Sequence, residues 1–403
     1  MRLRNTAWLV GLMAPLMVGL ATGCGDFWQA PTGTGSTTTC TTNCTTASSG
    51  NFYVLDAGAT PEVIGESFAS GTLTGITGSP WVLQATPYAM AIEPTNGNFL
   101  VISTTSGVFS YPLTSGALGT GSVISTDQAY AVQVDATGSW LLEAIPGTGG
   151  VTVGAIPIDS TTGATNGTEQ TVSFAVANAS VQANRMVISG DNANIFISLG
   201  AGGTLIVPFN AGVTAGTNPL STKAATIAVA NAAGSALAVA VDPGTTPRLF
   251  YVGETLANSA GTSGGLRVFN YSSLTSTLTQ ATGSPLSSGG LAPNVILPIA
   301  SGEYVYVANG QGTTATGNIT GFSITASTTA PITYTLATDT STATGIQPLA
   351  LAEDSTGTFV LEVGSLGSPY FDSFTFDTTT PGKLDAQVSS STAASYTAIV
   401  AAP

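Results

Sequence analysis

The sequence predicts an all-β fold: a seven-bladed β-propeller with four-stranded blades, whose ring is closed by the C-terminal strand pairing into the first blade. Two observations lead to this prediction. A strand-like segment recurs seven times along the 403 residues, and the first copy lacks a strand that the end of the chain can supply. Composition agrees, because only 7% of the residues are charged. The abundant Thr, Gly and Asn suit short strands and tight turns.

The recurring segment is short and apolar. Its copies are NFYVLD, NFLVIS, SWLLEA, NIFISL, RLFYVG, EYVYVA and TFVLEV, with their second residues 41 to 55 positions apart. Another apolar strand ending in a turn precedes every copy except the first, and a Gly-led strand and a weaker fourth strand follow. Four strands per unit of about 50 residues indicate a propeller blade.

The two ends of the repeat region complement each other. The first unit has no leading strand, whereas the chain ends in SYTAIVAAP with no unit behind it. Placed as the inner strand of the first blade, this segment would leave no unpaired inner edge. We therefore expect a signal peptide at 1–23, a tether at 24–50 and the propeller at 51–403.

The N-terminal segment indicates export. Two arginines precede the apolar run from Ala7 to Ala21, which has the length of a signal-peptide core. The small residues before Cys24 resemble the lipobox of bacterial lipoproteins, although Ala21 stands where a large aliphatic residue is usual. The resemblance implies acyl chains on Cys24 that anchor the protein in the lipid bilayer of the cell envelope. By analogy with such lipoproteins, Gly25 rather than Asp after Cys24 favours placement of the protein in the outer membrane, if the host has one. The alternative is an ordinary cleaved signal in which Cys24 is incidental.

The tether is rich in Thr, Ser and Gly and contains the other two cysteines. Cys40 and Cys44 could form a disulfide in an oxidising compartment. A metal site is the weaker alternative, because the chain has no His and no further Cys to complete four ligands. We expect neither a metal nor a cofactor.

The charge balance excludes one class of partner. Seven basic against 21 acidic residues give a net charge of −14, with no basic cluster to neutralise phosphates, so nucleic acid is not an expected partner. The absence of His also removes the commonest general base near neutral pH.

The motif order within the units resembles a known family. An apolar strand, a D-x-x-G turn, a segment such as YVYVAN and a Gly-led strand such as GFSI or RVFNY follow one another. This order is similar to that of the seven-bladed β-propeller lactonase group, which includes 6-phosphogluconolactonases and carboxymuconate cyclases. The likeness covers roughly residues 51–403. It implies the propeller fold and, as an activity, lactone hydrolysis, without a catalytic motif to carry over.

A candidate binding site follows from aligning the inner strands. One residue per strand falls at an equivalent position near one mouth of the ring: Tyr88, Tyr130, Asn184, Leu237, Asn294 and Leu349, with Tyr396 from the closing strand. Tyrosines and asparagines can bind a sugar or another polar neutral ligand, and the adjacent Arg185 could meet an anion. The alternative is that these side chains plug the channel and satisfy one another's hydrogen bonds.

Carboxylates give a weaker signal. Glu93, Asp135, Asp242 and Asp354 follow the inner strands, where we expect them to accept backbone N–H groups in turns. Glu143 and Glu362 occupy matching places on second strands, and Glu254 falls in a candidate loop of the face that bears the mouth.

Two functions remain. The main expectation is a non-catalytic, lipid-anchored binding module for a carbohydrate, peptide or protein ligand, because the chain combines an anchor, a tether and few ionisable groups. The alternative is a lactonase-type hydrolase, for which Glu254 as base and Arg185 as oxyanion partner are the weak catalytic candidates.

Overall fold

The computed structural model describes residues 50–69, 72–176, 181–213, 216–244, 246–256, 263–272, 277–310, 317–328, 333–367, 371–390 and 395–403. The predicted signal peptide, the predicted lipidation site Cys24 and the predicted Cys40–Cys44 disulfide lie outside these residues. Within them every regular element is a β-strand. No helix in this part of the chain is long and apolar enough to cross a membrane.

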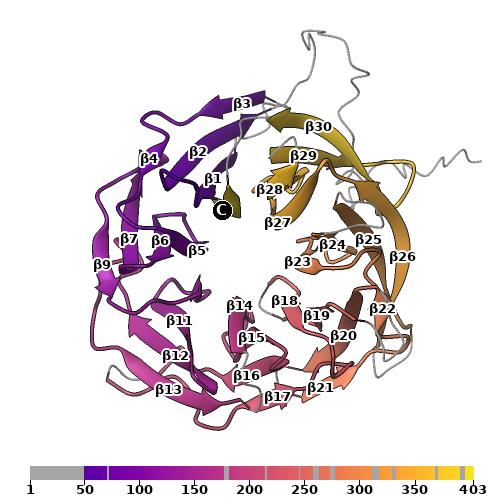
Figure 1. The fold of residues 1–403 in the computed structure, drawn as a ribbon, viewed down its shortest axis with the longest axis horizontal. Coiled ribbons are helices and arrows are strands. Elements are labelled where there is room, and N and C mark those ends of the chain that lie inside the picture. The colour runs from indigo at the N-terminus through magenta and orange to yellow at the C-terminus, as the bar shows by residue number, and fades with distance from the viewer. Residues whose placement is uncertain are drawn as a thin grey trace, which may run out of the picture.

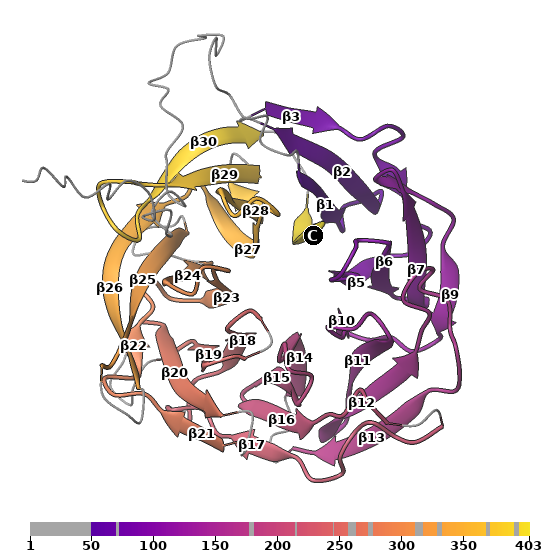
Figure 2. The same cartoon turned by 180° about the vertical axis from the view of Figure 1, so that it is seen from behind.

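The strands form antiparallel sheets that follow one another around a ring, as the colour gradient in Figures 1 and 2 shows. Hydrogen bonds join them into six sheets, five with four or five strands and one with nine. The protein is therefore an all-β propeller, as predicted.

Apart from β31, the strands of the first three sheets lie between residues 50 and 175. The first sheet contains β1 (Gly50–Asp56), β2 (Glu62–Ala69), β3 (Thr72–Gly75), β4 (Trp81–Val82) and, from the C-terminus, β31 (Tyr396–Ala401). The second contains β5 (Pro87–Ile92), β6 (Phe99–Thr104), β7 (Gly107–Thr114), β8 (Ala117–Leu118) and β9 (Ser122–Ser125). The third contains β10 (Ala131–Val134), β11 (Trp140–Gly147), β12 (Gly150–Pro157) and β13 (Gln170–Ala175).

The nine-stranded sheet follows in the ring. It contains β14 (Val181–Ile188), β15 (Asn194–Gly200), β16 (Thr204–Pro208), β17 (Ala225–Ile227), β18 (Ala236–Val241), β19 (Leu249–Glu254), β20 (Gly265–Ser272), β21 (Thr277–Gln280) and β22 (Leu286–Ser287). The fifth sheet contains β23 (Pro293–Pro298), β24 (Tyr304–Asn309), β25 (Asn318–Ala326) and β26 (Tyr334–Ala343). The sixth contains β27 (Ile346–Glu353), β28 (Phe359–Gly367), β29 (Phe371–Phe376) and β30 (Leu384–Ser390).

The expected count of seven separate blades is not reproduced by the sheets. The nine-stranded sheet consists of two consecutive runs, β14–β17 and β18–β22, which are joined at one residue pair, Gly200 with Ala236. The pair joins β15, the second strand of the first run, to β18, the inner strand of the second run. Hydrogen bonding alone therefore gives six sheets.

The two ends of the propeller meet in the first sheet. β31 pairs antiparallel with β1, from Phe52 opposite Ala401 to Asp56 opposite Tyr396. The backbone groups on the inner edge of β1 are thereby paired, and the edge offers no template for another chain. The predicted closure by the C-terminal strand is confirmed.

The core lies between the sheets. Every side chain of β6 and of β15 is buried, because sheets cover both faces of these second strands. Consecutive residues then contact different neighbours: on β11, Leu141 packs in a cluster with Phe99, whereas Leu142 packs in a cluster with Ile195. Alternating side chains thus tie each sheet to the sheets before and after it.

The turns that leave the inner strands are held by carboxylates. Asp135 accepts the backbone N–H groups of Thr137, Ser139 and Trp140 at 3.1, 2.8 and 2.7 Å. Asp354 holds the equivalent turn of the sixth sheet through three backbone amides in the same way. The prediction that these carboxylates serve turns is confirmed at both places.

Candidate functional site

The inner strands carry a register irregularity where the candidate ligand residues lie. In β5, Pro87 pairs with Thr104 and Ala89 with Ser103, so that Tyr88 between them has no partner. β18, β23 and β27 are interrupted in the same way at Leu237, Asn294 and Leu349. A bulge redirects a side chain. These four residues are partly exposed, whereas the residues directly before them are buried.

Two tyrosines form the most open part of this set. The rings of Tyr88 and Tyr130 stack with 4.5 Å between centroids and 14° between planes. Burial and the neighbouring Tyr130 hydroxyl raise the pKa of Tyr88. A cavity of about 690 Å³ adjoins Tyr130 and is also lined by Asn184, Gln182 and the turn between β11 and β12. The structure therefore brings Tyr88, Tyr130 and Asn184 together, and we call this cavity with its stacked tyrosines the mouth.

Arg185 reaches across the centre of the ring. It belongs to β14, and its guanidinium donates a hydrogen bond to the carbonyl oxygen of Leu349 on β27, which lies on another side of the ring (Figure 1). Burial lowers the pKa of this guanidinium. Within the part of the chain that the structure describes, no carboxylate forms an ion pair with Arg185.

The two asparagines of the set connect neighbouring inner strands. Asn184 Nδ2 donates to the carbonyl oxygen of Ala236 at 3.2 Å, and Asn294 Nδ2 donates to that of Pro348 at 3.1 Å. In each case the acceptor lies on the next inner strand. Each amide group therefore donates a hydrogen bond to the backbone of the next inner strand.

Tyr396 is a correction. It pairs with Asp56 and is only 6% exposed, packed in a cluster with Phe52 and Phe359. The register of β31 skips Thr397, just as that of β5 skips Tyr88, so that Thr397 holds the position assigned to Tyr396. The alignment was displaced by one residue, and a displacement of one residue changes the face of a strand on which a side chain lies.

Glu254 is a second correction. It ends β19 and is only 2% exposed rather than free in a loop. Arg267 Nη1 binds Glu254 Oε1 at 2.9 Å, and the backbone N–H of Ala230 donates to Oε2 at 2.9 Å. Among the residues described, no hydrogen bond or ion pair joins Glu254 to Arg185, so the structure gives no support to these two as a catalytic pair.

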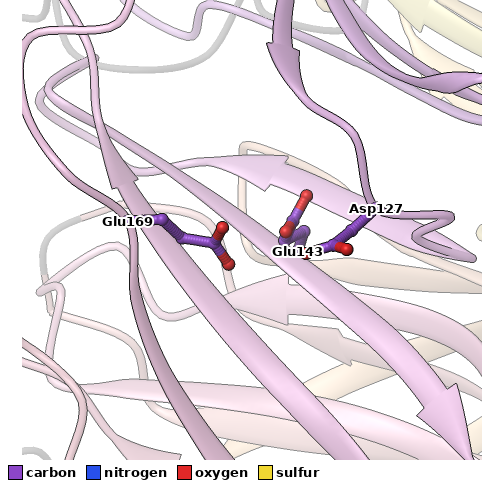
Figure 3. Close-up of side chains that lie close together, drawn as sticks. All are labelled: Asp127, Glu143 and Glu169. Carbon is purple, nitrogen blue, oxygen red and sulfur yellow. The ribbon is translucent and has the colours of Figure 1, made fainter.

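Sequence reasoning missed a group of three carboxylates, which Figure 3 shows. Ligand oxygens of Asp127, Glu143 and Glu169 all lie within 4.8 Å of one another. Glu143 has no exposed surface, and burial together with Glu169 and Asp127 raises its pKa to about 8. Aligning the repeats did not predict which residues lie near Glu143. Glu169 approaches it because β12 pairs with β11 on one side and with β13 on the other, and this register is not visible in the sequence.

Glu362, which matches Glu143 in the repeat, has a different environment. It has no exposed surface, and its register partner on β29 is Asp372. Burial, with a smaller contribution from Asp372, raises the pKa of Glu362, and burial raises that of Asp372 to about 6. Equivalent positions in the repeat therefore carry equivalent residues with different partners.

Comparisons with known proteins rest on structure. No family model matches the sequence, and no curated protein matches it either. A Bacteroides uniformis protein provisionally described as a 6-phosphogluconolactonase superimposes with a TM-score of 0.66 at 17% identity, over 88% of this chain and 99% of that one. The periplasmic gluconolactonase of Pseudomonas aeruginosa gives 0.66 at 15% identity over the same shares, and a Lactobacillus plantarum protein gives 0.62 at 14% identity over 88% and 100%.

These neighbours correct the main functional expectation. Two of them carry gluconolactonase names, which favours the lactonase alternative over the non-catalytic binding module expected from the sequence, and we set that expectation aside. At 14–17% identity, what the likeness establishes for this chain is the all-β propeller fold that it shares with lactonase-like propellers.

Proposed function

We propose that this protein is a lactone hydrolase that binds its substrate at the mouth beside Tyr88, Tyr130, Asn184 and Arg185. The observation that carries the proposal is the guanidinium of Arg185, which crosses the ring without a carboxylate partner in the described residues. Arg185 is partly exposed, and a cation that is largely shielded from water in a protein is usually paired with an anion. The names of the two gluconolactonase-like neighbours support the same reaction.

The chemistry requires a positive group where negative charge develops. Water adds to the lactone carbonyl, and the carbonyl oxygen becomes an oxyanion in the tetrahedral intermediate. The ring oxygen then leaves with a proton, and the product is a hydroxy acid that ionises to its carboxylate. A guanidinium has five N–H donors. Arg185 can therefore keep its bond to the Leu349 carbonyl and still donate to the oxyanion.

The mouth favours a neutral sugar lactone over a phosphorylated one. The stacked rings of Tyr88 and Tyr130 offer an apolar face and hydroxyl groups, which suit a polyhydroxylated ring. Phosphate recognition usually combines several cationic or N–H donors. The residues that line the cavity of the mouth carry no charge, and Arg185 is the single cation that we propose to act beside it. The net charge of −14 also disfavours anionic ligands.

The assay follows hydrolysis of glucono-δ-lactone by the full chain, with the spontaneous rate in buffer subtracted. We expect turnover, and we expect Arg185→Ala to lower kcat/KM by about 100-fold, the usual loss for one oxyanion donor. Lys223→Ala removes an exposed surface cation and serves as the matched control, with an unchanged rate. Glucono-δ-lactone should exceed its 6-phosphate in kcat/KM.

Two results would refute the proposal. One is a wild-type rate equal to the buffer rate with both lactones. The other is an Arg185→Ala variant that keeps its thermal unfolding temperature and hydrolyses lactone as fast as the wild type.

Two finer points belong to the same proposal. We count β14–β17 and β18–β22 as two blades, which gives seven, because the single pair Gly200 with Ala236 joins them. We also place the protein at the cell envelope through a lipid on Cys24, where Cys24→Ser should move it from the membrane to the soluble fraction.

A further inference from the structure

We propose that Asp127, Glu143 and Glu169 form a calcium-binding site between the second and third sheets. Each residue comes from a different segment: Asp127 follows β9, Glu143 lies on β11 and Glu169 directly precedes β13. The site is separate from the mouth, whose cavity is lined by other residues.

The spacing of the carboxylates fits a calcium ion. Their ligand oxygens lie within 4.8 Å of one another. Ca²⁺ binds oxygens at about 2.3–2.6 Å, so that ligands on opposite sides of the ion stand about 4.6–5.2 Å apart. Three carboxylates supply up to six oxygens, and water can complete the shell because Asp127 and Glu169 are partly exposed. Figure 3 shows the three carboxylates converging.

One carboxylate of this group is fully buried and has an oxygen without a hydrogen-bond donor. Glu143 has no exposed surface, and within the described residues its Oε2 atom has no hydrogen-bond partner. Its Oε1 atom accepts one hydrogen bond, from Ser125 Oγ at 3.3 Å. Glu169 Oε1 is likewise buried and has no partner there. Buried carboxylate oxygens need a donor or a cation, and neither Lys nor Arg pairs with these in this part of the chain.

The strand between the two glutamates leaves room for them. The residue opposite Glu143 on β12 is Gly154. A Cβ atom at this position would stand 2.5 Å from Glu169 Oε1 and 2.8 Å from Glu143 Cγ. The missing side chain therefore creates the space in which the carboxylates meet, independently of the acidic residues themselves.

The chemistry of the donors selects the ion. Carboxylate oxygens are the preferred ligands of hard cations, and no soft or nitrogen ligand belongs to the group. Ca²⁺ accepts irregular shells of six to eight oxygens, whereas Mg²⁺ requires near-octahedral geometry and gives up water reluctantly. Three fixed carboxylates with solvent on one side therefore suit Ca²⁺.

The test measures thermal unfolding of the full chain after removal of metal with EDTA. Added CaCl₂ should raise the unfolding temperature by a few degrees in a saturable manner, because an ion that binds the native state stabilises it. MgCl₂ at the same concentration should raise it less. Calorimetric titration with CaCl₂ should give one site, with binding weakened at least tenfold in Glu143→Gln and in Glu169→Gln.

Controls separate calcium binding from general destabilisation. Without calcium, Glu143→Gln should unfold at or above the wild-type temperature, because it replaces a carboxyl group that is buried beside Asp127 and Glu169 with a neutral amide. It should nevertheless lose the calcium response. Glu362→Gln alters the matching glutamate of the sixth sheet and should keep the full response. The proposal is overturned if the wild type gives no saturable rise, if Mg²⁺ gives an equal rise, or if both site variants keep the response. Glu169 is partly exposed, so its variant remains informative if Glu143→Gln fails to fold.

Discussion

A glutamate is buried at two places where neighbouring sets of strands pack together. The two glutamates have different partners for their carboxyl groups. Between β18–β22 and the group before it, Glu254 is 2% exposed and binds Arg267 at 2.9 Å. Between the second and third sheets, Glu143 is fully buried among two further carboxylates. At the first boundary the cation is the side chain of Arg267. We infer that the second boundary binds a calcium ion from solution. The stability of the protein should then depend on the calcium concentration.

At a third boundary, between β18–β22 and the fifth sheet, a neutral asparagine takes the place of the glutamate. Asn309 ends β24 at the place where Glu254 ends β19. Its Oδ1 atom accepts a hydrogen bond from Ser288 Oγ at 2.7 Å, and its Nδ2 atom donates to the Ser288 carbonyl at 2.8 Å. The same register position therefore accepts a charged or a neutral polar side chain, and in the sixth sheet it is occupied by Gly364 opposite Pro348.

The largest effect is expected from removing the cation that the chain itself supplies. Arg267→Met would leave Glu254 buried beside one backbone N–H, that of Ala230. Breaking a buried ion pair from one side costs about 3–5 kcal/mol, and we expect that loss in the free energy of unfolding measured with urea. The double variant Arg267→Met with Glu254→Gln should recover most of it. A cost below about 1 kcal/mol would show that water reaches this carboxylate.

A smaller effect with the opposite sign is expected at Glu362. The native pKa is raised, so the native state holds this proton more tightly than the unfolded chain. The resulting stability is present below the unfolded pKa of about 4.3 and is lost as the pH rises through the native pKa. Glu362→Gln should therefore change little at pH 4 and stabilise the protein by about 1–2 kcal/mol at pH 8.

The matched control is Glu303→Gln, which alters an exposed glutamate and should change stability by less than about 0.5 kcal/mol at both pH values. If Glu362→Gln destabilised the protein at pH 8, its carboxylate would have to be ionised and well solvated there. Asp372, with a pKa of about 6, contributes to the slope in the same direction and stays in the variant.

Sequence periodicity was sufficient for the all-β propeller fold and its closing strand, but not for the way two neighbouring units share one sheet. The repeated apolar segments became second strands, and the unpaired final segment became β31, because each depends on a pattern that spans a whole unit. The turn carboxylate Asp135 was also predictable, since its hydrogen-bond partners lie within five residues. Local and periodic signals are visible in a sequence.

Register and long-range contacts were not predictable. Tyr396 was misplaced because a bulge at Thr397 shifts the alignment by one position. The partner of Glu254 lies thirteen residues along on β20, where no motif marks it. The approach of Glu143 to Glu169 depends on Gly154 between them. Each of these contacts is fixed by which residues stand opposite across strands, which a single sequence does not state.

The smallest effect concerns the glycine that makes room for the three carboxylates. An alanine within a strand is ordinarily more stable than glycine by about 0.5–1 kcal/mol. At Gly154 the added Cβ would press on Glu169 and Glu143, so we expect Gly154→Ala to destabilise the protein by about 1 kcal/mol and to weaken calcium binding about tenfold. Urea unfolding and calorimetric titration measure the two effects.

Gly75→Ala on β3 is the matched control, because nothing lies within 4 Å of a Cβ atom there. It should leave stability unchanged or slightly higher and should not alter calcium binding. If Gly154→Ala behaved like Gly75→Ala in both measurements, the two glutamates would be free to move apart. Water rather than a bound cation would then stabilise the carboxylates between the second and third sheets. These carboxylates would differ from Glu254, which is paired with Arg267, only in how exposed they are to solvent.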